Sequence, residues 1–166
     1  MKKLLLIMAF ALISAMSFSQ SPIPKGSNQL NFGVGLSGWG VPLYIGIDHG
    51  IGSDFSIGGE FSYRDYRENW KDNYYRHNIM GFSGNVNYHF NRILQMPSNW
   101  DFYAGLNLGF YVWNSPNDYV GNQSSGLGLG GQIGGRYYFS DKVGINLEFG
   151  GNNAFNGGKF GLTIKI

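Results

Sequence analysis

Large apolar residues alternate with small or polar residues along most of the chain after residue 20. The clearest run is residues 143–149, in which every second residue is large and apolar: Val143, Ile145, Leu147 and Phe149. A two-residue period indicates a β-strand with different surroundings on its two faces. The pattern predicts eight strands, near residues 29–37, 41–49, 55–66, 77–90, 100–113, 126–139, 143–150 and 158–166.

The connections between these strands differ in length. Residues 50–54 and 140–142 are tight turns, whereas residues 65–76 and 114–125 are long and polar. The connection at residues 91–99 is longer than the other two short connections. Short turns at one end and long loops at the other are typical of outer-membrane barrels, whose tilted strands need about 9–11 residues to cross the bilayer.

The polar side of the pattern indicates which face meets lipid. It carries Gly, Asn and a few charged residues: Asp48, Glu60, Arg64, Arg136, Glu148 and Lys165. A water-exposed surface would carry many more Lys, Glu and Thr side chains, whereas a narrow lumen favours small residues with few charges. The sequence therefore predicts an all-β fold, an eight-stranded antiparallel up-and-down transmembrane β-barrel. The alternative is a soluble periplasmic barrel whose apolar face lines a ligand cavity.

The N-terminus has the pattern of a cleaved export signal over residues 1–19, with Lys2 and Lys3 before a short apolar run. Residues 20–27 are then a short periplasmic segment and residues 28–166 the barrel. Without the signal, Lys plus Arg falls from 12 to 10, equal to the 10 Asp plus Glu. A neutral chain does not favour binding to nucleic acid.

Composition supports a membrane barrel. Charged residues make up 13% of the chain, aromatic residues make up 17%, and 27 residues are Gly. No Cys is present, which excludes disulfides and lipid attachment through Cys.

Residues 137–144, Tyr-Tyr-Phe-Ser-Asp-Lys-Val-Gly, resemble the strand–turn–strand units of small outer-membrane barrels of the OmpX/OmpA transmembrane-domain type. The resemblance covers residues 28–166. It implies a monomer in the bacterial outer membrane, surrounded by lipids and lipopolysaccharide and inserted by the barrel-assembly machinery. Members usually end on an aromatic residue, whereas this chain ends on Ile166.

The lumen charges are the first candidate for function. If Phe139 faces Val143 across the tight turn, Gly134 faces Glu148, and Arg136 lies diagonally within reach of Glu148. We expect a buried network that neutralises charge inside a sealed barrel. The alternative, implied by the resemblance, is a switchable ion-pair plug. Eight strands leave no room for a general solute pore.

Histidine and serine residues do not form an evident reactive set. His49, His77 and His89 lie at scattered strand ends without the spacing of metal ligands. A lipid-modifying barrel enzyme would need a Ser, a His and an acid in contact, but the strand heights of Ser62, Ser83 and His89 do not converge. We predict no catalytic residue, no cofactor and no metal site.

The loop around residues 63–76 mixes aromatic residues with both signs of charge. Candidate contacts are Tyr66, Arg67, Trp70, Tyr74 and Tyr75, because aromatic and Arg side chains often anchor binding surfaces. They could bind an extracellular partner, contact lipopolysaccharide, or form an extended hairpin above the membrane. The predicted function is therefore structural, in envelope integrity, or a surface interaction.

Overall fold

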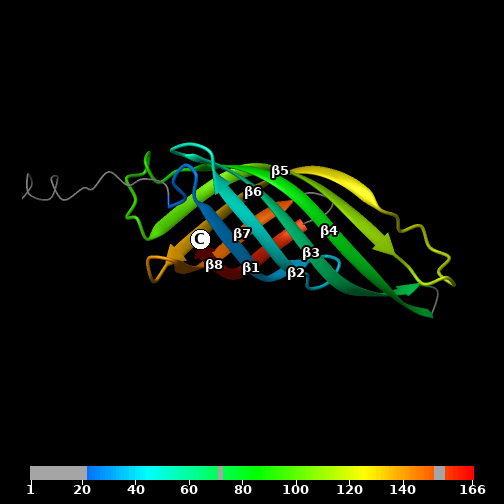
Figure 1. Cartoon of the computed structure of the whole chain (residues 1–166). Helices are drawn as coiled ribbons and strands as arrows, with labels where there is room; N and C mark the ends of the chain where they lie inside the picture. The colour runs from blue at the N-terminus through cyan, green and yellow to red at the C-terminus, as the bar shows by residue number, and fades with distance from the viewer. Residues whose placement is uncertain (1–21, 71–72, 152–155) are drawn as a thin grey trace, which may run out of the picture.

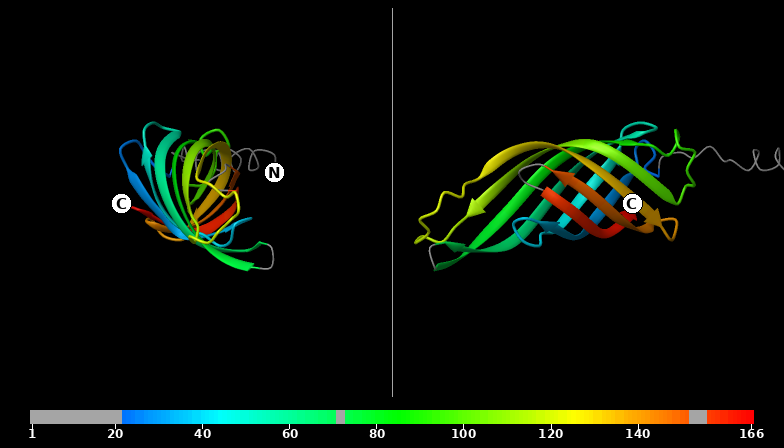
Figure 2. Two further views of the ribbon diagram at one scale, coloured as in Figure 1. Left: turned by 90° about the vertical axis from the view of Figure 1, so that its right-hand side faces the viewer. Right: turned by 180° about the vertical axis from the view of Figure 1, so that it is seen from behind.

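The protein is described here by a computed structural model that covers residues 22–70, 73–151 and 156–166. Eight antiparallel strands follow one another in chain order and close into a barrel, because β1 pairs with β8 as well as β2. Figure 2 shows the closed barrel close to end-on. The strands are β1 (Asn28–Ser37), β2 (Leu43–Gly50), β3 (Phe55–Trp70), β4 (Asn73–His89), β5 (Trp100–Asn114), β6 (Gly126–Tyr138), β7 (Val143–Gly151) and β8 (Asn156–Lys165). The predicted fold class is confirmed.

Apolar side chains point outward and polar side chains point into the lumen. In β2, for example, Ile47 is 46% exposed and the adjacent Asp48 only 3%. A soluble barrel has the reverse arrangement, so the alternative of an apolar-lined cavity is wrong. An outer surface with so many exposed Leu, Ile, Val and Phe side chains is stable in lipid, where barrel closure also satisfies the backbone hydrogen bonds.

The outer surface is not uniformly covered by side chains. Gly59 of β3 and Gly84 of β4 are paired and face outward, between Ile47 on one side and Leu108 on the other. Neither glycine has a heavy atom nearer than 3.8 Å to the position that a Cβ would take. These two glycines line a shallow groove of about 700 Å³ in the apolar surface.

The two ends of the barrel differ in their connections. At one end, called the terminal end, lie the start of β1, the end of β8 and the turns at residues 51–54, 90–99 and 139–142. The turn before β7 is closed by the Phe139 amide, which donates to the Val143 carbonyl at 3.1 Å. The longer turn at residues 90–99 is fastened to its neighbour by an ion pair between Arg92 and Asp54. The opposite end, called the loop end, carries the other connections.

The prediction of a long loop at residues 65–76 is wrong, because most of these residues belong to strands. Residues 65–70 and 73–76 continue β3 and β4 as one hairpin, paired as far as Trp70 and Asn73. Figure 1 shows β3, β4 and β5 reaching past the other strands at the loop end. An extended hairpin was one of the alternatives for this segment, and the described residues 65–70 and 73–76 form one.

Residues 22–27 lie across the terminal end. The Gly26 amide donates to the Gly50 carbonyl at 2.8 Å, and the Gly50 amide donates to the Ser27 carbonyl at 3.0 Å. A Cβ at Gly50 would lie 2.2 Å from the Pro24 carbonyl oxygen, so only glycine allows this close approach. The predicted export signal, residues 1–19, lies outside the described residues.

Candidate functional site in the barrel lumen

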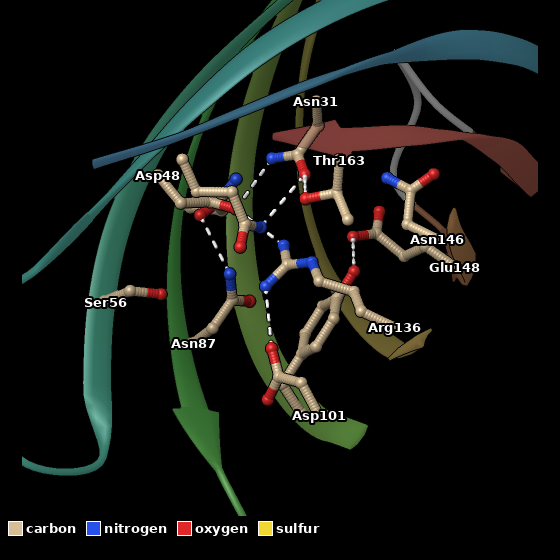
Figure 3. Close-up of polar contacts among 12 residues, drawn as sticks. Asn31, Asp48, Ser56, Asn87, Asp101, Arg136, Asn146, Glu148 and Thr163 are labelled. Carbon is tan, nitrogen blue, oxygen red and sulfur yellow. Dashed lines mark hydrogen bonds and ion pairs between the residues drawn. The ribbon is translucent and has the colours of Figure 1, made fainter. Parts of the chain in front are cut away.

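A buried arginine lies at the centre of a first charge cluster. Arg136 of β6 donates to Asp48 of β2 at 2.6 Å and to Asp101 of β5 at 3.0 Å. All three side chains are almost completely buried (Figure 3). The guanidinium also lies 4.2 Å from the centroid of the Tyr103 ring. The planar fork of Arg suits contact with two carboxylates, because a buried charge needs both pairing and hydrogen bonds.

Uncharged side chains extend this first cluster toward the β1–β8 seam. The Asn31 amide donates to Asp48 at 2.9 Å, and the Thr163 hydroxyl donates to Asn31 at 2.9 Å. A hydrogen bond also joins Tyr138 to Gln29. The cluster therefore ties β1, β2, β5, β6 and β8 together across the lumen.

A lysine lies at the centre of a second cluster, nearer the loop end. Lys159 of β8 contacts Glu60 of β3 at 2.8 Å and Glu148 of β7 at 2.6 Å. Glu148 also accepts a hydrogen bond from the Tyr103 hydroxyl at 2.8 Å. Because the Tyr103 ring also lies against Arg136, this side chain connects the two clusters.

Amide side chains fill more of the lumen. Asn107 donates to Gln132 at 2.9 Å, and Gln132 donates to Asn87 at 2.7 Å. Two small cavities are found in the described lumen, of about 10 and 20 Å³. Such volumes are close to the space that one water molecule needs. The described side chains leave only small voids at these two places.

The structure places the predicted lumen residues in different groups. The predicted register is confirmed, since Gly134 faces Glu148. Arg136, however, makes its ion pairs with Asp48 and Asp101, and Glu148 pairs with Lys159. Asp101 and Lys159 were missing from the predicted set. Both lie on the polar parity of their strands, which is the signal that could have identified them.

Two predicted charges lie apart from these clusters. Arg64 is near the loop end, where it donates to Ser37 at 2.9 Å and lies 5.4 Å from the centroid of the Trp39 ring. Lys165 is near the terminal end, with its ammonium 3.8 Å from the centroid of the Tyr138 ring. The structure thus brings together four of the six predicted lumen charges. Asp48 pairs with Arg136, and Glu60 and Glu148 share Lys159.

A hydrogen-bonded Ser–His–Asp set lies near the terminal end. Ser56 Oγ is 2.9 Å from His89 Nε2, and His89 Nδ1 is 2.7 Å from Asp101 Oδ1. All three residues are buried. The sequence named His89 with Ser62 and Ser83 at strand heights that do not converge, and the structure places neither serine at hydrogen-bond distance from it. Ser56 and Asp101, the partners of His89 in the structure, were missing from that set. Among the described residues, no group of His, Asp and Glu has the arrangement of a metal site.

The loop end carries an inward-facing aromatic cluster, composed of Tyr66, Tyr75, His77, Trp113 and Tyr119. The His77 and Tyr119 ring centroids are 4.6 Å apart, and the Trp113 indole donates to His77 Nδ1 at 3.1 Å. The paired residues 65–70 and 73–76, which continue β3 and β4 at the loop end, are called the extension. Two predicted surface contacts, Tyr66 and Tyr75, thus belong to the inner packing of the extension. Their inward direction follows from the same alternation as in the lumen.

The outer side of the extension remains exposed. Arg67 and Arg76 face each other across β3 and β4, and Tyr74 is 82% exposed. Arg76 contacts Asp65 at 2.5 Å, and this hydrogen bond lowers the pKa of the Asp65 carboxyl below its ordinary value. The side chain of the remaining predicted contact, Trp70, lies outside the described part of the chain.

Comparison with known proteins identifies the fold. No family model and no curated protein matches the sequence. OprG from Pseudomonas aeruginosa matches with a TM-score of 0.68 at 9% identity, over 88% of this chain and 99% of OprG. The N-terminal β-barrel domain of OprF from the same organism matches with a TM-score of 0.59 at 14% identity, over 86% of this chain and 98% of the OprF domain. Neisserial surface protein A matches with a TM-score of 0.56 at 14% identity, over 84% of this chain and 94% of that protein.

OprG is an outer-membrane protein, the Neisserial protein is a surface protein and the OprF structure is a β-barrel domain, and each is matched over nearly its whole length. The shared feature is the closed barrel of eight antiparallel strands in chain order. The chain therefore has the fold of the small eight-stranded outer-membrane β-barrels of OmpA/OmpX type.

Proposed function

We propose that this protein is a non-enzymatic barrel of the bacterial outer membrane that serves envelope integrity and surface contacts and is not a general pore. The observation that carries the proposal is that Arg136 and Lys159 each bridge two carboxylates across the lumen. In this proposal the terminal end faces the periplasm and the loop end faces outward. The barrel is a monomer surrounded by lipids and lipopolysaccharide, and the barrel-assembly machinery inserts it.

The charge clusters support a sealed lumen for an energetic reason. Separating a buried ion pair leaves unpaired charges in a medium of low polarity, which costs about 3–5 kcal/mol per pair. A solute path along the lumen would have to separate the Arg136 and Lys159 contacts in succession. Eight strands also give an interior only wide enough for side chains.

The extension beyond the membrane supports a role in surface contacts. Its exposed side carries Arg67, Tyr74 and Arg76 directly beyond the apolar outer surface. Asp65 compensates part of the positive charge of this side through its ion pair with Arg76, and the exposed guanidinium groups of Arg67 and Arg76 would donate further hydrogen bonds to a phosphate group. We therefore assign this exposed side to contact with the phosphorylated head groups of the outer leaflet.

Fractionation and a permeability assay test the proposal. We expect the protein in the outer-membrane fraction, with a band that migrates differently before and after boiling. Liposomes containing the folded barrel should not swell in small sugars, whereas liposomes with a general porin should. A soluble periplasmic protein, or swelling comparable to that of the porin, would contradict the proposal.

A further inference from the structure

Ser56, His89 and Asp101 are arranged as a serine nucleophile with its base and orienting acid. Because an ionised carboxylate only accepts hydrogen bonds, His89 donates its Nδ1 proton to Asp101 across 2.7 Å. In the neutral imidazole, Nε2 would then accept the hydrogen bond of the Ser56 hydroxyl across 2.9 Å. This is the order of contacts by which a histidine activates a serine hydroxyl.

The three side chains are held by adjacent strands. Ser56 lies second in β3, His89 ends β4, and Asp101 lies second in β5. The second carboxylate oxygen of Asp101 is fixed by Arg136 at 3.0 Å, which sets the orientation of the acid. Side chains on rigid strands with supporting contacts keep the fixed geometry that nucleophilic chemistry needs.

The N-terminal segment closes this site from the terminal end. Gly50 is the strand partner of Ser56, and the carbonyl groups of Ile23 and Pro24 pack directly over Gly50. Ile23 is only 1% exposed, although it precedes the first strand. The segment is joined to β2 by the backbone hydrogen bonds of Gly26 and Ser27 with Gly50. Displacing residues 22–24 would therefore expose the neighbourhood of Ser56 to the periplasmic side.

We propose that Ser56 is a nucleophilic serine that takes the acyl group of small esters reaching it from the terminal end, once residues 22–24 move aside. Ser56 Oγ would attack the ester carbonyl carbon while His89 Nε2 takes the hydroxyl proton. The C–O bond to the alcohol then breaks, and the alcohol leaves with that proton. Water hydrolyses the acyl-serine by the same route and restores the hydroxyl. This inference goes beyond the proposed function, because it adds a reaction that the structural role does not include. Residues 22–24 keep the site closed and slow to react in the barrel described above.

Labelling with diisopropyl fluorophosphate tests the site in the folded full barrel. The serine oxygen would form a bond to phosphorus as the P–F bond breaks and fluoride leaves, and intact mass spectrometry would detect one added group. We expect slow labelling at Ser56. Ile23→Gly should speed it at least about tenfold, because removing a buried side chain weakens the packing of the segment.

Matched variants separate reactivity from a structural role of the same residues. Ser56→Ala should abolish labelling and His89→Gln should slow it by about 10²-fold. Ser62→Ala, at another buried lumen serine of β3, should leave it unchanged. The heat-dependent band shift checks that each variant is folded. Absence of labelling in folded Ile23→Gly, or labelling that persists in Ser56→Ala, overturns the inference, while the location and permeability results stand independently.

Discussion

One step along a strand moves a side chain from the apolar outer face of the barrel to the polar lumen. Leu147 is 47% exposed on the outer face, whereas the adjacent Asn146 is buried and accepts a hydrogen bond from Tyr44 at 2.9 Å. The cost of a charge at a single position therefore depends on parity and on depth along the strand.

At this scale we predict a depth-dependent effect of arginine on the outer face. Leu147→Arg, near the middle of β7, should destabilise the barrel by about 2–4 kcal/mol, because the charge enters hydrocarbon. Leu36→Arg, near the loop end of β1, should cost about 0–1 kcal/mol, because the long side chain reaches the interface. Equilibrium unfolding in lipid vesicles measures both. Equal losses would refute the assigned position of Leu147 within the membrane.

Single residues also mark the limit of what the sequence could predict. Alternation placed Asp48, Glu60, Arg136 and Glu148 on the lumen side, because parity is a local property. It could not supply their partners, since the Arg136–Asp48 contact joins residues 88 positions apart across the barrel. That contact depends on the stagger between strands, which sets the heights of side chains in the lumen. The Ser56–His89–Asp101 contacts depend on it as well.

At the scale of the element, the β3–β4 hairpin has two different faces beyond the membrane. Its inner face packs Tyr66, Tyr75 and His77 with Trp113 and Tyr119, while its outer face carries Arg67 and Arg76. The inner aromatic packing gives the hairpin a hydrophobic face, which a two-stranded ribbon needs to be stable. The many polar residues of this segment favoured a loop in the sequence analysis, and only the paired strands reveal this packing.

The outer face of the hairpin should respond to the lipid head groups. In vesicles that contain lipopolysaccharide, wild-type barrel should unfold at a higher temperature than in phosphatidylcholine alone. The double variant Arg67→Gln, Arg76→Gln should lose most of this gain, because phosphate loses its cationic partners. Lys142→Gln, exposed in the turn at the terminal end, serves as the control and should retain it. A full gain in the double variant would show that these arginines do not bind the head groups.

At the scale of the whole molecule, closure depends on the seam between β1 and β8. Gly33 and Gly161 are partners at this seam, and a Cβ at Gly33 would lie 2.2 Å from the Phe160 carbonyl oxygen. A side chain at this position cannot be accommodated without moving the backbone of β8. The number of strands and their order could be predicted from alternation and connection length, but this close approach depends on the curvature of the closed sheet.

Closure should therefore fail when Gly33 is enlarged. Gly33→Leu should abolish the compact, heat-sensitive band, because β8 can no longer approach β1 along its full length. Gly38→Leu is the matched control, since Gly38 has no atom within 4 Å of an added Cβ. Gel migration with and without boiling measures the effect. A normal band shift for Gly33→Leu would mean that the seam tolerates a side chain.

The groove over Gly59 and Gly84 has a consequence for the surrounding bilayer. A fluid bilayer does not leave about 700 Å³ of surface relief empty, because unfilled contacts forfeit dispersion energy. Hydrocarbon tails should bend inward to reach bare peptide backbone at this place. A second depression of about 770 Å³ lies over β5, β6 and β7, beside Ile133, Gly135 and Leu147. The first shell of lipids should therefore be uneven, with tails at these two depressions exchanging more slowly than tails over the rest of the apolar surface.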